Sequence, residues 1–348
     1  MVTRRVVRPL YVVLGLVGFA VAGPPAPALG VPLAGHGHGR GRVGGGSGGR
    51  TRPRTSLEGR DVSYPQCGTT LPAAPAFGIV GVNGGVPNGR NPCLGPSSAF
   101  PSYAQSELYW AEAASTGAVG GLQPDVSVYL NTADPGNVDG ATVIGDWPTS
   151  GSTPFGACAA VPVAVHRTVV TVGASSPACA WEYGYAKASQ DVKWVSSAGL
   201  GIDTQAPLVT VPGAVASFAW WLDVETGNTW QPGPAGSAMN VAVLQGMVAA
   251  LRTAGATAVG VYSTASQWAQ VTGTATASSG PLVGLPDWVP GAASLAGAVA
   301  NCGLPSFTGG KVVLTQWTGT AGITGTAGTT DADHHCGPAP SGTAPVVP

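Results

Sequence analysis

Charged side chains are scarce in this sequence. Asp, Glu, Lys and Arg make up 9% of the 348 residues, whereas about 25% is usual in globular proteins. The charges are also unevenly placed: residues 1–60 hold nine arginines and one acid, while residues 61–348 hold six basic and 15 acidic residues. This larger part therefore carries a net charge of −9, which argues against nucleic acid as a partner.

The apolar run near the N-terminus is too short to span a membrane comfortably. It reads LYVVLGLVGFAVA, 13 residues, whereas a spanning helix needs about 20. A basic stretch precedes it, and Ala20-Val21-Ala22 fits the small-x-small pattern of signal-peptide cleavage; Ala26-Pro27-Ala28 is a second option. We therefore expect a signal peptide over residues 1–22, a secreted or cell-wall-associated protein and no membrane span after cleavage. A membrane anchor is the alternative.

Residues 23–57 lack any apolar period and are rich in Gly, Arg and Pro, which is typical of a flexible linker. His36 and His38 in this linker could hold a metal loosely, but we expect solvated side chains, and no cofactor is indicated. Residues 58–337 have a normal length for a single α/β barrel. Residues 338–348 are expected to form a flexible tail, and the protein is expected to be a monomer.

Cysteine spacings of the zinc-binding kind are also lacking, since there is no C-x-x-C motif. All six cysteines follow residue 58. An even number of cysteines behind a signal peptide is typical of disulfide bonds. Six cysteines allow many pairings, and proximity in the sequence favours Cys67–Cys93, Cys158–Cys179 and Cys302–Cys336.

Short Val-rich apolar runs alternate with helical stretches between residues 58 and 337. Continuously apolar runs indicate strands buried on both faces, and the alternation implies right-handed βαβ units. The predicted strands are 59–64, 77–83, 125–131, 217–225, 257–263, 282–289 and 311–318. The predicted helices are 103–115, 185–198, 237–254 with Ser237 as N-cap, and 293–301. The pattern predicts an α/β fold, a TIM-like (β/α) barrel, with a long disulfide-containing loop inserted at 140–180.

Two of the few acids, Asp223 and Glu225, lie one residue apart at the end of the predicted strand SFAWWLDVE. Residues i and i+2 of a strand point to the same side, so both carboxylates face together and Val224 faces away. In parallel α/β barrels the active site lies at this end of the strands. Neighbouring carboxylates raise the pKa of at least one of them, as a general acid requires. A calcium site is the alternative, because carboxylate oxygens suit that cation.

Three further acids are placed to join this pair. Asp61 lies at the end of the first predicted strand, and Asp331 and Asp333 follow the last one after a Gly/Thr-rich loop. We therefore expect four or five acids on one rim of the barrel. In the alternative, Asp61 caps a loop and the two later acids belong to a solvated tail. The adjacent His334 and His335 are interpreted as loop residues rather than ligands.

Tryptophan dominates the few aromatic residues, with 10 in the chain. Trp220 and Trp221 are consecutive in a strand, so they must point to opposite faces. Several polar or aromatic residues near predicted strand ends are candidates for substrate binding, although core packing is the default for any single Trp; they are Trp230, Asn228, Tyr262, Trp288 and Trp317.

Four motifs occur in order over about residues 59 to 335: GRDVSYPQ, WWLDVET, GVYST followed by a Trp, and VVLTQWTG followed by DAD. Together they resemble glycoside hydrolase family 25, the secreted lysozymes (muramidases) that cut the β-1,4 bond of peptidoglycan. The resemblance implies a barrel that is irregular in its last strands. It also implies Glu225 as general acid, Asp223 as its partner, and Asp61 with Asp331 or Asp333 lining the cleft.

The chain departs from this family at two places. The second strand of family members usually ends in a charged K-A-T-E-G type motif, whereas here it reads GIVGVNGG, with Asn83 as its only polar side chain. The 140–180 insertion is also foreign, and the chain resembles a looser set of secreted glycoside-hydrolase-like domains as well.

We therefore expect a secreted glycoside hydrolase-like protein that cleaves or engages a polysaccharide, the β-1,4-linked glycan of peptidoglycan, through a carboxylate general acid. The alternatives are a glycan-binding barrel without turnover and a structural wall protein whose Arg/Gly-rich tail binds anionic polymers.

Overall fold

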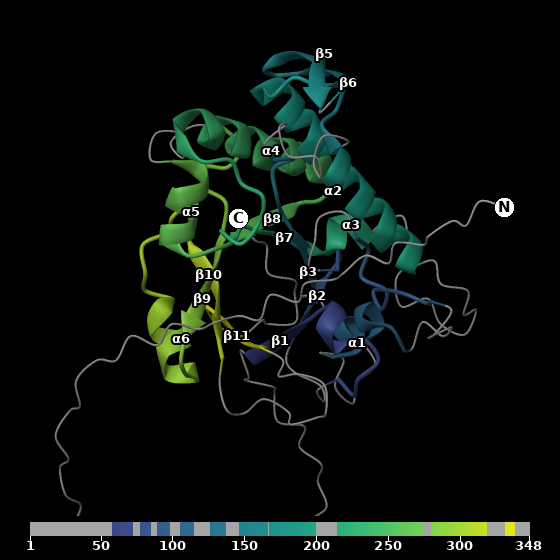
Figure 1. The fold of residues 1–348 in the computed structure, drawn as a ribbon. Helices are drawn as coiled ribbons and strands as arrows, with labels where there is room; N and C mark the ends of the chain where they lie inside the picture. Colours follow the sequence, from purple (N-terminus) through teal and green to yellow (C-terminus); the bar gives the residue numbers. More distant parts are fainter. Residues whose placement is uncertain are drawn as a thin grey trace, which may run out of the picture. The chain divides into compact units, whose positions relative to one another are not determined.

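Eight strands close into a barrel in the computed structural model (Figure 1). Their order around the barrel is β1-β11-β10-β9-β8-β7-β3-β2. Six of the eight strand pairings are parallel, and the two that involve β11 are antiparallel. The fold is therefore the predicted α/β barrel, irregular at its last strand. The strands are β1 (Glu58–Val62), β2 (Phe77–Gly81), β3 (Ser127–Asn131), β7 (Ala219–Asp223), β8 (Ala258–Tyr262), β9 (Asp287–Ala292), β10 (Val312–Trp317) and β11 (Asp331–His335).

The structure describes residues 58–71, 77–84, 89–97, 105–114, 126–136, 146–165, 167–199, 214–273, 280–318 and 331–337. These residues belong to the unit Pro53–Pro348. The predicted signal peptide, linker and C-terminal tail lie outside the described residues, as does most of the Gly/Thr-rich loop before Asp331.

The two faces of the barrel strands pack against different partners. Trp220 is fully buried in the large apolar cluster that the strands share with the helices. Trp221 packs inside the barrel with Ile79, Trp288 and Leu314. The two adjacent tryptophans therefore point to opposite faces, as their positions in the strand predict.

Helices surround the barrel, and two of them approach closely through glycines. A Cβ on Gly184 of α2 would lie 2.0 Å from the Val243 carbonyl oxygen, and one on Gly246 of α4 would lie 2.1 Å from the Trp181 carbonyl oxygen. Only residues without a side chain fit at these two contacts. The helices are α1 (Glu107–Ala114), α2 (Pro177–Gly199), α3 (Ala214–Ser217), α4 (Gly233–Thr253), α5 (Ala265–Thr272) and α6 (Leu295–Asn301), with a 3₁₀ turn η1 at Tyr64–Gln66.

Helix α4 differs from its prediction at its N-terminus. It begins at Gly233 with Pro232 as N-cap, and Ser237, the predicted cap, is buried inside the helix. Within the described ranges α4 is the one helix long and apolar enough to cross a membrane, but 72% of its apolar window is buried inside the fold. We interpret it as a core helix.

Other boundaries also differ from the sequence-based expectation. Helix α2 starts at Pro177 rather than 185, and β9 covers 287–292 rather than 282–289. Helices α3 and α5 were not predicted; α5 begins after Thr264, whose hydroxyl accepts a hydrogen bond from the Gln267 amide. Strand β11 was expected to be a loop, because its sequence DADHH contains hardly any apolar residues.

The described residues of the predicted insertion that precede α2 form a small sheet rather than a loop. Three antiparallel strands form it in the order β4-β5-β6, and it lies next to the first turns of α2 (Figure 1). Cys158 in β5 bonds Cys179 in α2, so the sheet is covalently joined to the helix layer. The strands are β4 (Ser150–Thr153), β5 (Gly156–Val165) and β6 (Thr168–Gly173).

Disulfide bonds join the cysteines in the three pairs that sequence proximity favours. The Cα–Cα distances are 5.4 Å, 4.6 Å and 5.5 Å in the order Cys67–Cys93, Cys158–Cys179 and Cys302–Cys336. The third bridge ties the end of β11 to the end of α6.

Candidate active site

Asp223 is the last residue of β7 and lies at the mouth of the barrel. Its register partners are Asn131 in β3 and Tyr262 in β8. The Asn131 amide donates to Asp223 Oδ2 over 3.3 Å, while Asp223 Oδ1 has no hydrogen-bond partner. With 8% of its surface exposed, the carboxyl is largely removed from water. Burial first and the charge of Glu225 second raise its pKa well above the ordinary value.

Glu225 lies two residues further along and is less buried than Asp223. Its carbonyl oxygen accepts a hydrogen bond from the Trp230 indole over 2.8 Å. The side chain of Asn228 in the same loop donates to Asn131 Oδ1 and to the Thr132 carbonyl oxygen, over 3.2 Å and 2.7 Å. This loop is thereby fixed on the end of β3. Burial and the charge of Asp331 raise the pKa of Glu225.

Three more acids project from β1 and β11. In the antiparallel ladder between these strands Asp61 is opposite Asp331, and Asp333 is opposite Gly59. Opposed residues and those two positions away point to the same side of a sheet, so all three acids share the inner face. The sequence-based expectation placed Asp331 and Asp333 in a segment after the last strand. They belong instead to the strand that closes the barrel.

A chain of hydrogen bonds extends from β8 to Asp61. The Tyr262 hydroxyl donates to Gln316 Oε1 over 2.8 Å, and Gln316 Nε2 donates to Asp61 Oδ2 over 3.0 Å. Burial and the charge of Asp331 raise the pKa of Asp61 to about 7, although the Gln316 bond acts in the opposite direction.

Asp333 is the deepest of the five acids and is fully buried. Its Oδ1 accepts a hydrogen bond from the Trp288 indole over 3.1 Å. When Asp333 and Asp61 are both ionised, Asp333 Oδ2 has no hydrogen-bond donor. A protonated Asp333 can instead donate a hydrogen bond to Asp61. Burial first, with the adjacent Asp61, raises the pKa of Asp333 well above its usual range. Burial therefore favours the protonated form of Asp333.

The candidate substrate-binding residues fall into two groups. Trp230 and Asn228 are half-buried in the loop after Glu225, and Tyr262 points into the barrel, with its ring centroid 4.6 Å from that of Trp288. Trp288 and Trp317 are only 2% and 5% exposed. Trp288 therefore packs inside the barrel and Trp317 in the layer outside it, and neither offers a ring face to a sugar, contrary to the expectation for them.

Trp317 packs outside the barrel against small side chains. Its neighbours are Ala292, Ala298 and Ala332. The guanidinium carbon of Arg60 lies 5.9 Å from the centre of its ring. This cation–π contact stabilises the β1–β11–β10 wall rather than a ligand.

Sequence reasoning missed several polar residues at this end of the barrel. Asn131 and Gln316 bond directly to Asp223 and Asp61, respectively. Asp134 accepts from Gln231 Nε2 over 2.6 Å, and burial raises its pKa to about 7. The sequence feature that could have identified these residues is an amide or acid within or just after an apolar strand, as in SVYLN and VVLTQW.

Carboxylates and imidazoles are common metal ligands, and this end of the barrel holds both acids and the paired histidines. Across the ranges that the structure describes, no group of three His, Cys, Asp or Glu residues is arranged to hold a metal ion. His334 and His335 are part of β11, and burial lowers the pKa of both.

Comparison with known proteins adds a family match. Residues 214–283 match the family described as lysozyme-like protein 1. No curated protein matches. A muramidase from Trichobolus zukalii aligns with 14% identity and a TM-score of 0.37 over 81% of this chain and 94% of its own. A muramidase from Acremonium alcalophilum aligns with 16% identity and a TM-score of 0.38 over 80% and 93%. Similarity this low carries no functional information.

The family match covers a limited but central part of the fold. It runs from α3 through β7, α4 and β8 to α5 and just beyond. It therefore includes Asp223, Glu225 and the loop that bears Asn228 and Trp230. The resemblance to lysozymes that the sequence motifs indicate is confirmed for this segment: residues 214–283 are similar to the lysozyme-like protein 1 family.

Proposed function

We propose that this protein is a secreted glycoside hydrolase that cleaves the β-1,4-linked glycan of peptidoglycan. The observation that carries the proposal is the pair Asp223 and Glu225 at the carboxyl end of β7, inside the segment similar to lysozyme-like proteins. The carboxyl ends of barrel strands are where catalytic residues of such folds gather. Glycoside hydrolysis typically requires two carboxyl groups beside the scissile bond.

Glu225 is the proposed general acid. It is less buried than Asp223 and extends beyond the strand end, so a glycosidic oxygen can reach it. Burial and Asp331 raise its pKa, which favours the protonated form that the first step needs. Glu225 would donate its proton to the leaving oxygen as the bond between that oxygen and the anomeric carbon breaks.

Asp223 is the proposed partner that stabilises the oxocarbenium-like centre. Asn131 holds its Oδ2, and Asn228 in turn holds Asn131. The second carboxyl can act as nucleophile or stabiliser, and an N-acetyl group of the substrate can take the nucleophilic role instead. The stereochemical outcome depends on the separation of the two carboxyl groups, and strand geometry does not fix it because Glu225 lies two residues past the end of β7.

Asp331, together with Asp61 when it is ionised, would supply the negative field around this pair. A cationic transition state is stabilised by fixed negative charge in a water-poor site. The raised pKa values of Asp61 and Asp333 favour their neutral forms, which limits the repulsion among the acids.

Export fits the three disulfide bonds, because such bonds persist in oxidising compartments. The proposed partner is a polysaccharide of the cell wall, bound by a monomer.

Incubation with purified peptidoglycan, followed by mass spectrometry of the soluble products, tests the function. Hydrolysis predicts fragments with new reducing ends at the sugar–sugar bond. Retention of the protein on the wall without any release of reducing ends would favour the alternative, a glycan-binding barrel without turnover.

A further inference from the structure

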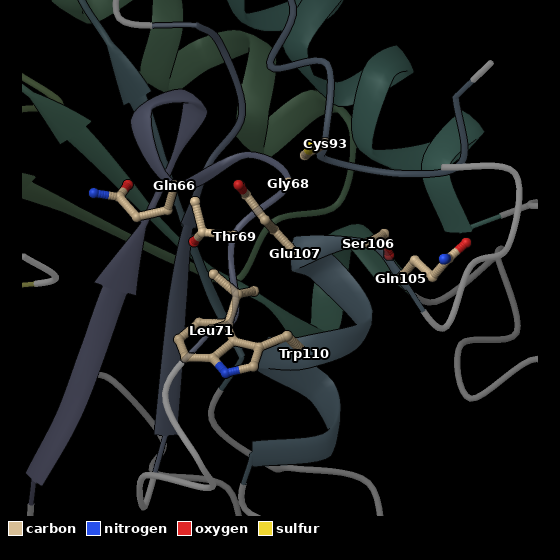
Figure 2. A pocket seen from close by; sticks show the side chains of 9 residues that line it. All are labelled: Gln66, Gly68, Thr69, Leu71, Cys93, Gln105, Ser106, Glu107 and Trp110. Carbon is tan, nitrogen blue, oxygen red and sulfur yellow. The ribbon is translucent and has the colours of Figure 1, made fainter. Parts of the chain in front are cut away.

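A cavity of about 320 Å³ lies between the segment that follows β1 and the first turn of α1 (Figure 2). None of the five acids of the candidate active site lines it. Its lining combines two apolar side chains with several polar ones. Leu71 and Trp110 provide the apolar part, and Thr69, Ser106 and Glu107 are among the polar residues.

Glu107 is the group in this cavity that lacks a partner. Its side chain is 2% exposed, and its Oε2 accepts a short bond from Asn91 Nδ2 at 2.6 Å, but its Oε1 has none. Figure 2 shows the carboxylate pointing from the start of α1 toward Gly68 and Cys93. A buried carboxylate oxygen without a donor is costly. A ligand that brings a hydroxyl or N–H group would remove this cost.

The backbone N–H groups of the first turn of α1 are not available to a ligand, because each already donates within the fold. The Glu107 amide donates to the Cys93 carbonyl oxygen over 2.9 Å, and the Leu108 amide to that of Leu94 over 3.4 Å. The Tyr109 amide donates to Ser106 Oγ over 3.1 Å. The group that remains without a hydrogen bond is therefore an acceptor, Glu107 Oε1.

Asn91 connects this cavity to the mouth of the barrel. Its Nδ2 also donates to the carbonyl oxygen of Gly81, the last residue of β2, over 2.8 Å. A Cβ on Gly81 would lie 2.9 Å from the Tyr129 hydroxyl. Burial raises the pKa of Tyr129, and so do the charges of Asp61, Asp223 and Glu107. The charge of Glu107 thus raises the pKa of Tyr129, as the charges of the active-site acids Asp61 and Asp223 do.

We propose that this cavity is a second glycan-binding subsite that receives one neutral sugar ring. The ring would lay its apolar face against Leu71 and Trp110 and donate a hydroxyl or acetamido hydrogen to Glu107 Oε1. The volume lies near the lower end of the range for ligand pockets, about 300–1,000 Å³, and suits a small ligand. The identity of the sugar rests on the proposed function, whereas the site rests on the cavity and its unpaired carboxylate oxygen.

Titration with N-acetylglucosamine, followed by NMR of the tryptophan indole N–H signals, tests the subsite. The Trp110 signal is assigned from its loss in Trp110→Phe. In Glu107→Gln the amide oxygen would keep the bond from Asn91, so the amide nitrogen would face the cavity and replace an acceptor by a donor. The affinity should fall about tenfold or more, as expected for losing a hydrogen bond to a charged group.

Glu112→Gln is the matched control, because Glu112 is a buried glutamate in the same helix but does not line the cavity. It should bind the sugar as the wild type does. Thermal unfolding of each variant confirms that it is folded. An unmoved Trp110 signal in the wild type, or equal affinity in Glu107→Gln, would overturn the subsite.

Peptidoglycan turnover, measured on the same preparations, separates this inference from the proposed function. Turnover without a shift of the Trp110 signal overturns the subsite alone. A shift that Glu107→Gln weakens, in a protein without turnover, supports the subsite and counts against hydrolysis.

Discussion

Asp61 and Asp331 face each other across the antiparallel ladder between β1 and β11. Side chains in such opposed positions have Cβ atoms about 4.5–5.5 Å apart. Asp331 is the charged neighbour that raises the pKa of Asp61, and it is also the one that raises the pKa of Glu225. It therefore links the acid of the first strand with the proposed general acid across the mouth of the barrel.

Replacement of the proposed general acid gives the first prediction. Glu225→Gln should lower the rate of glycan cleavage by about 10²–10⁴-fold, because the amide cannot protonate the leaving oxygen. Wall binding and the midpoint of thermal unfolding should change little. Release of reducing ends from purified peptidoglycan is the measurement, and unchanged turnover would remove Glu225 from the mechanism.

The second prediction is an acidic pH optimum, below about pH 6, with activity lost by about pH 8. Glu225 must hold a proton while a second carboxyl is ionised. Raised pKa values let Glu225 and its neighbours keep protons in mildly acidic solution, and ionisation of Asp61, with a pKa of about 7, adds repulsion above neutrality. A pH–rate profile that stays flat through pH 8 would contradict this.

Stability should also depend on pH, in a direction set by the same acids. The pKa of Asp61 rises from 3.8 in its ordinary state to about 7 in the folded protein. The folded state then binds more protons than the unfolded state between these values, so the free energy of unfolding falls as the pH rises through this window.

Asp333→Asn tests this pH dependence, because the amide can still accept from Trp288 and donate to Asp61. At pH 8 the variant should be more stable than the wild type, because burial raises the pKa of Asp333 and ionising it in the folded protein lowers the free energy of unfolding. At pH 4, where the buried acid is already neutral, the two proteins should have similar midpoints in urea. A variant that is equally destabilised at both pH values would show that Asp333 is held ionised.

The bridge at the end of β11 gives the fourth prediction. Removing it with Cys302→Ala and Cys336→Ala should cost about 2–5 kcal/mol of stability. Activity should fall by about 10²-fold, because β11 carries Asp331 and Asp333 and a displacement of these acids by about 1 Å can reduce the rate that much. The matched control is Cys158→Ala with Cys179→Ala, which frees only the small sheet from α2. Equal loss of activity in both double variants would mean that the effect is one of stability alone.

Glu107→Gln should stabilise the protein at alkaline pH. Burial raises the pKa of Glu107 from 4.5 to about 7. Because this carboxylate must ionise in the interior, stability falls by about 3.5 kcal/mol as the pH rises from 4.5 to above 7, at about 1.4 kcal/mol per unit. The variant should therefore unfold at higher temperature than the wild type at pH 9, with little difference at pH 4. A lower unfolding temperature at pH 9 would argue that the ionised carboxylate has an internal partner.

The parallel part of the barrel could be predicted because its strands are continuous apolar runs. FGIVG and AWWLD are buried almost throughout, and only a barrel or layered α/β sheet buries both faces of a strand. The disulfide pairing could also be predicted, because the cysteines bond in consecutive pairs along the sequence.

In other parts of the chain, the sequence pattern predicts a different structure from the one that the residues adopt. DADHH alternates acids with one alanine and is typical of a solvated segment, yet Asp333 is buried because β11 pairs with strands on both sides and position 333 faces the inside of the barrel. Residues 282–285 look like the start of a strand, but Leu282 and Leu285 are buried in a turn that precedes β9. The cavity at Glu107 depends on segments that meet only in three dimensions.

The position of β11 has a consequence for the integrity of the protein. The strand that closes the barrel comes from the C-terminal end of the folded domain and lies between β10 and β1, the N-terminal strand. Loss of a few residues at either end would leave two open sheet edges and separate Asp61 from Asp331 and Asp333 at once. A domain that lacks β1 or β11 would thus lose its acid cluster together with its barrel, so an intact barrel is itself a condition for the proposed hydrolysis.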